Sequence, residues 1–553
     1  MIKTTLTRID AALSRLALAR RGWGVVFVAL LSLMLSLPGF FDLPAVDRDE
    51  SRFSQATKQM VETGDYIDIR LGDQTRYKKP VGIYWLQSIP VRIVGPELAR
   101  EIWVYRLPAL TGAMLASVLT YLIAATLVGP KPALLAGGLM AATLVLGAEA
   151  RQAKTDAALL ASILAAQYVL ARLWMQGGDA IRKTWPWLFW AGLGASMLIK
   201  GPIGVMVVGL TAAGLSVLRR DLRWLLPLRF GPGLALFAVI VLPWYVLITL
   251  KAGSAFWAES LGQDMLGKVT EGQEGHGAPP GTYLLLAWVT FWPAALILPF
   301  GIAYAWREKL TPAVQFCLAW IVPFWLIFEI VATKLPHYTL PTYPALAVLT
   351  AAGWLARPQN SRPGWPHAVL IAVLLLIGAA LTIVPVAASL TISIGPSLIW
   401  ALGAVLVLLG GLASWYALRA GQGMVPLIGM ALMSAGLGFA FYGHLGQVQY
   451  LWPAKQLARI EADQQMCDEA VLASIGYHEP SLQLQSRLRP VLTHAPQAAE
   501  IARTADCALI YVAAPERDAF LDALPDAPAA IAVVEGMNLG TGREQMIEVY
   551  RFD

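Results

Sequence analysis

Apolar runs about as long as a bilayer is thick recur along the whole chain, separated by short polar segments or by segments marked with Gly and Pro. The hydrophobic fraction of 57% and the charged fraction of 14% exclude an ordinary soluble globular protein. We therefore expect a mainly α-helical, polytopic membrane bundle with about thirteen spans.

Basic residues predict how the bundle is oriented. The first apolar run, from about Gly22 to Phe41, follows a basic N-terminal segment. Its length and the lack of a small-residue cleavage site favour a retained helix over a signal peptide. By the positive-inside rule the N-terminus then lies in the cytoplasm. Basic residues also crowd the loops that would face inward: Lys131, Arg172, Arg182, Lys183, Arg219, Arg220, Arg223, Arg229, Arg307, Lys309, Arg357, Arg362 and Arg419.

The chain changes character near residue 447. After a membrane part at 1–446, the segment 447–553 contains strand-like stretches such as "AVLASIGY", "CALIYVAA", "AAIAVVEGMNL" and "QMIEVYRF". Helical patterns lie near 453–465 and 515–523. With an odd number of spans, this small α/β domain lies outside. Cys467 and Cys507 each stand just before one of its strands, and both a disulfide and two separate buried cysteines fit the sequence.

The net charge of +6 comes mostly from the inward loops. No basic helix with interleaved aromatic residues is present in the sequence, so we expect no nucleic-acid partner.

Six polar clusters fall on the outer side of this topology, which suggests a functional site at that membrane face. They are the segments 47–52, 76–85, 149–156, 199–202, 270–280 and 334–344.

The first cluster leads into a helix. Phe53, Ala56 and Met60 share one stripe, which predicts an interfacial helix from Asp49 onward and further interfacial helices to about residue 95. Asp49 as a simple N-cap is the alternative. That alternative leaves unexplained why three acids and two arginines gather at a lipid boundary.

The basic clusters predict anion binding. Lys78 and Lys79 follow Arg76 and precede an apolar stretch with aromatic residues, among them Tyr84. Attraction to anionic lipid headgroups is the alternative. Lys200 and Lys334 lie at outer span ends, against the orienting bias, and each is followed by Gly-Pro or Leu-Pro. Snorkelling explains each lysine alone, whereas all of them together indicate a site for an anion.

A metal site is a weaker hypothesis. Glu271, Glu274 and His276 have a spacing that could hold a divalent ion if their loop folded back. Three glycines make a mobile polar loop the favoured interpretation.

Four segments carry a family resemblance: "RDESRFSQATKQMVETGDYI", "RYKKPVGIYWLQ", "KGP" and "KLPHYTLPTYPAL". In this order they resemble membrane glycosyltransferases of the C-type fold. Within that group the segments resemble bacterial members of the protein-mannosyltransferase-like superfamily. The resemblance is strongest to the 4-amino-4-deoxy-L-arabinose lipid A transferases. The resemblance covers most of the chain.

The resemblance implies an inverting transfer of a sugar from a polyprenyl-phosphate donor to an acceptor, lipid A or lipopolysaccharide, at the periplasmic face of the bacterial inner membrane. It makes Asp49 the catalytic carboxylate, acting as a general base for a hydroxyl acceptor or as an electrostatic stabiliser for a phosphate. The implied substrate-binding residues are Glu50, Arg52, Lys78, Lys79, Tyr84, Lys200, Lys334, His337 and Tyr338.

Cations beside the departing phosphate do what metal ions do in many soluble transferases, so we expect no obligatory metal, while a divalent ion stays possible. The partners would be the donor, the acceptor and membrane lipid, and the protein a monomer. Two features depart from the family: Lys78 stands where an acid is common, and the loop near 256–280 differs. A protein O-mannosyltransferase-like enzyme and a hexose or uronic-acid transferase therefore stay open.

Two other classes are alternatives. A transporter would carry charges near the middle of its spans and often repeated halves, whereas the apolar runs here are almost free of charge at mid-span. A non-catalytic assembly factor would not need Asp49 or the outer lysines.

Overall fold

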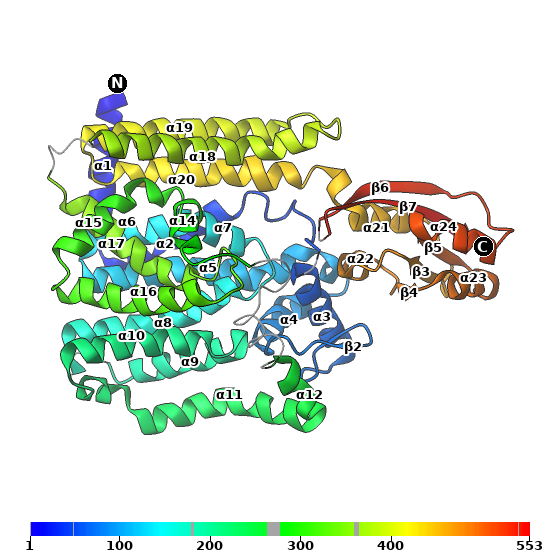
Figure 1. Ribbon diagram of the computed structural model, residues 1–553, viewed down its shortest axis with the longest axis horizontal. Helices are drawn as coiled ribbons and strands as arrows, with labels where there is room; N and C mark the ends of the chain where they lie inside the picture. The colour runs from blue at the N-terminus through cyan, green and yellow to red at the C-terminus, as the bar shows by residue number, and fades with distance from the viewer. Residues whose placement is uncertain are drawn as a thin grey trace.

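The computed structural model describes residues 2–47, 49–178, 182–260, 262, 277–358, 364–539 and 541–553, without the side chains of residues 2, 3 and 366. Figure 1 shows a large helical bundle, a smaller mixed domain at the C-terminal end, and short elements between them. The N-terminus belongs to the bundle and the C-terminus to the smaller domain (Figure 1).

The bundle is built from apolar helices of unequal burial. α8 is mostly enclosed by its neighbours, whereas α11 and α19 expose many leucines and valines, as helices facing lipid do. The helices of the bundle are α1 (Ile2–Leu18), α2 (Arg21–Ser36), α5 (Ile102–Leu127), α6 (Pro130–Ala142), α7 (Leu144–Ala150), α8 (Asp156–Gln176), α9 (Trp185–Lys200), α10 (Ile203–Arg219), α11 (Phe230–Ala252), α14 (Thr282–Thr290), α15 (Leu298–Arg307), α16 (Pro312–Ile330), α17 (Tyr343–Ala356), α18 (Trp365–Leu390), α19 (Leu398–Ala420) and α20 (Val425–Leu437).

Seven helices of the described residues are long and apolar enough to cross a membrane, or up to nine if each bent pair is one span. The bent pairs are α6 with α7, at 58°, and α14 with the segment Ala294–Arg307, at 108°. Three shorter apolar helices, Arg21–Ser36, Ile203–Arg219 and Leu340–Ala356, add further candidates. A multi-pass membrane bundle is thus confirmed, while the number of about thirteen spans stays a prediction.

The junction holds the predicted interfacial helices. α3 (Asp49–Thr63) and α4 (Gly82–Val94) pack against each other, with the hairpin of β1 (Arg70–Leu71) and β2 (Gln74–Thr75) between them in sequence. The apolar stripe Phe53, Ala56 and Met60 is buried, as its helical spacing predicts. α3 therefore begins at Asp49 and holds this residue at the edge of the bundle.

The C-terminal domain is a five-stranded mixed sheet in the order β4-β3-β5-β7-β6. β3 is parallel to β4 and β5, whereas β7 is antiparallel to β5 and β6. One face packs on α21 and α22, and the other on α23 and α24. Its elements are α21 (Pro453–Asp463), β3 (Val471–Ile475), α22 (Pro480–Gln485), β4 (Val491–Thr493), α23 (Ala495–Thr504), β5 (Ala508–Ala513), α24 (Arg517–Ala523), β6 (Ala532–Asn538) and β7 (Arg543–Phe552).

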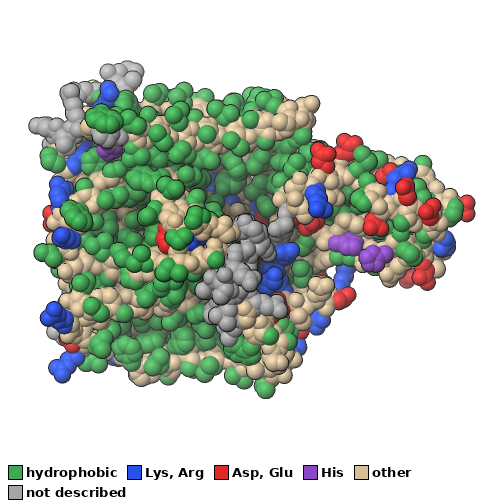
Figure 2. Space-filling view, in the orientation of Figure 1, with side chains coloured by type: hydrophobic (Ala, Val, Ile, Leu, Met, Phe, Trp, Pro, Cys, Tyr) green, Lys and Arg blue, Asp and Glu red, His purple; other side chains and the backbone are tan. Residues whose placement is uncertain are grey.

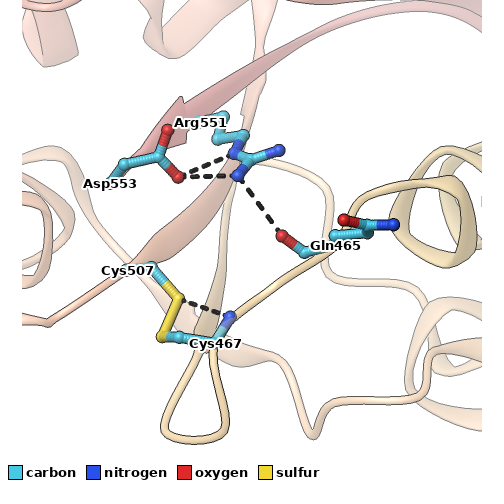
Figure 3. The surroundings of a disulfide bond; sticks show 5 residues. All are labelled: Gln465, Cys467, Cys507, Arg551 and Asp553. Atoms are coloured by element: carbon cyan, nitrogen blue, oxygen red, sulfur yellow. Dashed lines mark hydrogen bonds and ion pairs between the residues drawn. A yellow bond between two sulfur atoms is a disulfide. The ribbon is translucent and has the colours of Figure 1, made fainter.

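The two cysteines of this domain form a disulfide, which decides between the two interpretations that the sequence left open. Figure 3 shows the Cys467 amide directed at the Cys507 sulfur, at 3.1 Å. Arg551 of β7 joins Asp553 to the backbone carbonyl of Gln465, two residues before Cys467 (Figure 3). The third cysteine, Cys317, is free and buried in α16.

Charge is distributed unevenly on the surface. Figure 2 shows basic side chains along the end of the bundle that lies away from the C-terminal domain, and a mostly hydrophobic belt over its middle. Acidic side chains are frequent on the C-terminal domain (Figure 2). This distribution agrees with basic loops on one side of a membrane and a polar domain on the other.

Candidate active site

Asp49 is an exposed carboxylate in the first turn of α3. A negative charge is favoured there because the free N–H groups of a helix start carry partial positive charge. Asp49 forms no hydrogen bond or ion pair with another described residue. Its negative charge favours the protonated forms of Lys154 and His337 and so acts to raise their pKa values. This carboxylate is thus available to a ligand at the edge of the bundle.

Glu50, the next residue, is buried and only 2% exposed. Its two oxygens accept hydrogen bonds from Nε and Nη2 of Arg106, at 2.8 and 2.9 Å. The backbone amides of Val46 and Ala153 donate to the same carboxylate, at 3.0 and 2.8 Å. The structure therefore supports a structural role for Glu50, and its predicted contact with substrate remains without support.

The cluster 76–85 divides into a buried and an open part. Arg76 is buried, donates from Nε to the Tyr84 hydroxyl at 3.3 Å and lies over the Phe53 ring at 5.1 Å. Tyr84 itself is fully buried, where burial raises the pKa of its hydroxyl. Lys78 is exposed and Lys79 partly exposed. Among the charged side chains of this cluster, the two lysines are thus the ones placed to meet a ligand.

A cavity of about 940 Å³ opens beside these lysines. We call it the α9–α11 cavity. Its apolar part is formed by side chains of α9, α10, α11 and α16, among them Met197, Met206, Phe237, Leu242 and Val246. Its polar end is formed by Lys78, Lys79, Asp156, Lys200, His337 and Tyr338. A long apolar space that ends at basic side chains suits a lipid with an anionic head.

Next to this polar end lies a buried network of charges. Nζ of Lys200 donates to Asp156 Oδ1 at 2.6 Å, and Nζ of Lys154 to Glu149 Oε1 at 3.2 Å. His337 joins both pairs, with Nδ1 at 3.5 Å from Glu149 and Nε2 at 3.8 Å from Asp156. Lys200 also lies 5.8 Å from the centre of the Tyr338 ring. The predicted residues Lys200, His337 and Tyr338 are therefore brought together.

Two groups of this network have shifted pKa values. Burial lowers the pKa of Lys154, but the carboxylates of Glu149 and Asp156 outweigh it and raise the pKa above its ordinary value. Burial lowers the pKa of His337 to about 3, although Asp156 opposes the shift. Near neutral pH the network thus contains an ammonium at Lys154 and a neutral imidazole at His337.

Lys334 was predicted to bind an anion, but in the structure its ammonium group binds backbone carbonyls. Its Nζ donates to the carbonyls of Phe328, Glu329 and Val331, at 3.1, 3.0 and 2.7 Å, and so caps the end of α16. The side chain is 6% exposed and does not line the α9–α11 cavity. Since these bonds use the three donors of an ammonium, Lys334 is a structural cap in this conformation.

No role was predicted from the sequence for Arg106, Glu149, Lys154 or Asp156. The segment 149–156 was noted as a polar cluster, but only the fold shows which of its residues face the cavity. For Arg106, a single arginine within an apolar run was the available signal. Arg52, a predicted substrate-binding residue, is partly exposed, and its positive charge lowers the pKa of Asp47.

The weak metal candidates Glu271, Glu274 and His276 lie outside the described residues. Within the described part of the chain, no group of three His, Cys, Asp or Glu side chains is arranged to hold a metal ion.

Comparison with known proteins agrees with this geometry. A family model described as dolichyl-phosphate-mannose-protein mannosyltransferase matches residues 78–246, which include Lys79, Asp156 and Lys200. The crystal structure of ArnT from Cupriavidus metallidurans bound to undecaprenyl phosphate matches with a TM-score of 0.74, at 20% identity over 96% of this chain and 98% of that one. The chain has the ArnT fold. The apo structure of the same ArnT matches with a TM-score of 0.72 at 21% identity.

Curated proteins also match part of the sequence of this chain. An undecaprenyl phosphate-alpha-4-amino-4-deoxy-L-arabinose arabinosyl transferase of Aeromonas salmonicida (strain A449) is 26% identical over 333 residues, 60% of this chain and 59% of that protein. An uncharacterized protein of Aquifex aeolicus (strain VF5) is 28% identical over 308 residues, 55% of this chain and 58% of that protein. The matches span about three fifths of these relatives. The resemblance predicted from the motifs is confirmed, since the chain shares the fold of a solved ArnT.

Proposed function

We propose that this protein is a glycosyltransferase that moves a sugar from a polyprenyl-phosphate donor to lipid A or lipopolysaccharide. The proposed sugar is of the aminoarabinose type, as in the name of the Aeromonas relative. The observation that carries the proposal is the α9–α11 cavity, an apolar space whose polar end holds Lys78, Lys79 and Lys200. The ArnT fold supports it, since the matching ArnT structure contains undecaprenyl phosphate.

In this reaction an acceptor oxygen attacks the anomeric carbon of the donor sugar. The bond between that carbon and the phosphate oxygen breaks, and the polyprenyl phosphate leaves with the electron pair. Lys78 and Lys79 would stabilise the negative charge that develops on the departing phosphate. The apolar walls would hold the polyprenyl tail.

Asp49 has two possible tasks, which depend on the acceptor. For a hydroxyl acceptor it would take the proton as general base. A phosphate acceptor of lipid A is already ionised, and Asp49 would then orient the reactants and stabilise positive charge on the sugar. Attack from the face opposite the phosphate inverts the anomeric centre. The proposal needs no obligatory metal because the lysines supply the positive charge.

The proposed location is the bacterial inner membrane, with the active site and the C-terminal domain at the periplasmic face and the N-terminus in the cytoplasm. The positive-inside rule supports this orientation, since basic side chains gather at the end of the bundle away from the C-terminal domain (Figure 2). The proposed partners are the donor, the acceptor and surrounding lipid, and the protein would act as a monomer.

The test is mass spectrometry of lipid A, core lipopolysaccharide and membrane glycoproteins from cells with and without this chain. We expect lipid A to carry an added aminopentose only when the chain is present. The mass of the addition separates an aminopentose from a hexose or a uronic acid, and the acceptor fraction separates lipid A from protein. Identical spectra in all fractions would refute the proposed function.

The role of Asp49 is tested by comparing product formation in Asp49→Asn with that in a control variant, Asp73→Asn. Asp49→Asn should insert and fold normally but reduce product at least about a hundredfold, within the range by which positioned acid–base groups accelerate reactions. Asp73→Asn changes an exposed aspartate of the β1–β2 turn, whose ion-pair partner at 3.7 Å is Arg489, which is also exposed. It should leave product unchanged. Normal product from Asp49→Asn would remove Asp49 from the reaction.

A further inference from the structure

The C-terminal domain contacts the proposed active site through α22. Leu482 of this helix belongs to the core of the C-terminal domain. Leu484, two residues on, is fully buried in a separate cluster with Ala45, Val91 and Ala153 of the bundle and the junction. α22 therefore inserts one side chain into each domain and joins them by apolar packing.

Ala153 links this contact to the site. Its amide donates to Glu50 at 2.8 Å, and its carbonyl accepts from Gln87 at 3.1 Å. The neighbouring residue along the chain is Lys154, a member of the buried charge network. Leu484 thus belongs to the same apolar cluster as the turn that leads into this network.

A second contact runs directly to α3. Nζ of Lys58 donates to the carbonyls of Gln483 and Leu484, at 3.2 and 3.3 Å, and so caps α22 from the side of α3. The Lys58 side chain is only 13% exposed. Glu461 of α21 holds the segment after α22 in place, since its carboxylate accepts from the amides of Arg487 and Leu488.

A third contact lies just before Asp49. Oδ1 of Asp47, the Tyr477 hydroxyl and the Ser481 hydroxyl are buried at this contact, and Ser481 lies close enough to Asp47 to stabilise its ionised form. The carboxylate of Glu479 is also close enough to repel Asp47, while Arg52 attracts it. Two carboxyl groups in this small polar space make the contact costly once Asp47 is ionised.

We propose that α22 of the C-terminal domain is a positioning element for the active site: it holds α3 in place, and with it Asp49. The charge of Asp49 acts on Lys154 and on the cavity residue His337. Leu484 and Lys58 are the positioning residues, and none of the three contacts includes a group that the proposed reaction uses. The inference rests on the proposed function for its effect on transfer, but the contact itself is testable without activity.

The third contact predicts a pH dependence. Burial raises the pKa of Asp47 to about 7, repulsion by Glu479 adds to the shift, and Ser481 and Arg52 oppose it. A carboxyl whose pKa is higher in the docked state favours docking when it is protonated. Docking therefore weakens as pH rises from about 4 to about 7 and is constant above that. Between pH 5.5 and 7.5 the docking equilibrium should change roughly twentyfold.

The test measures hydrogen exchange of the α3 amides, residues 49–63, by mass spectrometry on the purified full chain. Leu484→Ala should accelerate their exchange at least tenfold, whereas Leu484→Met should restore protection. Leu492→Ala, which truncates an exposed leucine of β4, is the control and should leave the exchange of α3 unchanged. If Leu484→Ala does not fold, Lys58→Met, which keeps the apolar stem but removes the donors, gives the same measurement.

The second measurement is the rate of sugar transfer from a polyprenyl-phosphate donor to lipid A, followed as a function of pH. Relative to wild type, Leu484→Ala should lower kcat at least tenfold with little change in the donor KM. In wild type, hydrogen exchange of the α3 amides should become faster between pH 5.5 and 7.5, after correction for the intrinsic exchange rate. In Asp47→Asn this acceleration should be absent. Unchanged α3 exchange in both Leu484→Ala and Lys58→Met would overturn the inference. A wild-type protein without transfer would refute the proposed function alone.

Discussion

Arg106 and Glu50 form a bidentate ion pair that is closed off from solvent, at 0% and 1% side-chain exposure. The remaining donors of Arg106 reach the carbonyls of Phe40, Leu43 and Pro44, between 2.7 and 3.0 Å. One guanidinium thus fixes both the segment before α3 and the first turn of α3. The position of Asp49 depends on this pair, because Asp49 immediately precedes Glu50.

Removing one partner of the pair should be strongly destabilising. Arg106→Met leaves a buried carboxylate without a counter-charge and three carbonyls without donors, at a cost of about 3–5 kcal/mol. We expect a large fall in Tm of the detergent-solubilised protein. Arg517→Met, which removes an exposed arginine paired with Glu548, is the control and should change Tm little. An Arg106→Met protein as stable as wild type would contradict this role.

Lys79 should contribute to binding of the donor phosphate. A hydrogen bond to a charged group contributes about 1.5–3 kcal/mol, so Lys79→Met should weaken binding of undecaprenyl phosphate about 10- to 150-fold. The measurement is a binding titration with the lipid in detergent micelles. Lys309→Met changes an exposed lysine in the turn between α15 and α16 and should bind the lipid as wild type does. Equal affinities of the two variants would exclude Lys79 from the phosphate site.

The sequence predicted the local elements well, because their patterns depend on neighbouring residues. The stripe Phe53, Ala56 and Met60 is a local helical signal, and α3 begins where it indicates. β3, β5, β6 and β7 coincide with apolar stretches long enough to recognise. The three-residue strand β4 was missed, since its pairing with β3 is a property of the sheet and its own sequence is too short to be distinctive.

The partners of the charged residues could not be predicted in this way. Lys200 and Lys334 look alike in the sequence, since each ends an apolar run and precedes a proline motif. In the fold, Lys200 meets Asp156 at the cavity, whereas Lys334 turns back onto the carbonyls of its own helix. Which of the two occurs depends on whether a carboxylate from another helix lies within reach. Only the tertiary structure fixes that distance.

A larger side chain in the wall of the α9–α11 cavity should weaken binding of the polyprenyl lipid. Val246 of α11 lines the cavity, so Val246→Trp should fill part of its space and lower the affinity for undecaprenyl phosphate at least tenfold. Val239 lies on the same helix, is 70% exposed and does not line the cavity. Val239→Trp should therefore bind normally in the same titration. Full affinity in Val246→Trp would place the polyprenyl chain elsewhere.

The disulfide should stabilise the C-terminal domain. Cys467 and Cys507 are 40 residues apart, and closing a loop of that length restricts the unfolded chain by about 4 kcal/mol in the chain-entropy model. The Cys467→Ser/Cys507→Ser double variant should therefore expose β3 and β5 to faster hydrogen exchange. The helices of the bundle should be unaffected, and Cys317→Ser, which alters the free cysteine of α16, should leave β3 and β5 protected.

His337 should make the protein less stable in mild acid. Its pKa is lowered to about 3 by burial, against an ordinary value of 6.5, so the unfolded chain binds a proton that the folded chain does not. Stability is thus fully present above about pH 6.5 and is lost as pH falls toward 3, by about 2 kcal/mol at pH 5. The fall in Tm between pH 7.5 and 5.0 should be smaller in His337→Gln than in wild type. His494→Gln alters an exposed histidine and should keep the wild-type slope. An equal slope in wild type and His337→Gln would mean that His337 is already protonated, and therefore charged, within the network beside Glu149 and Asp156.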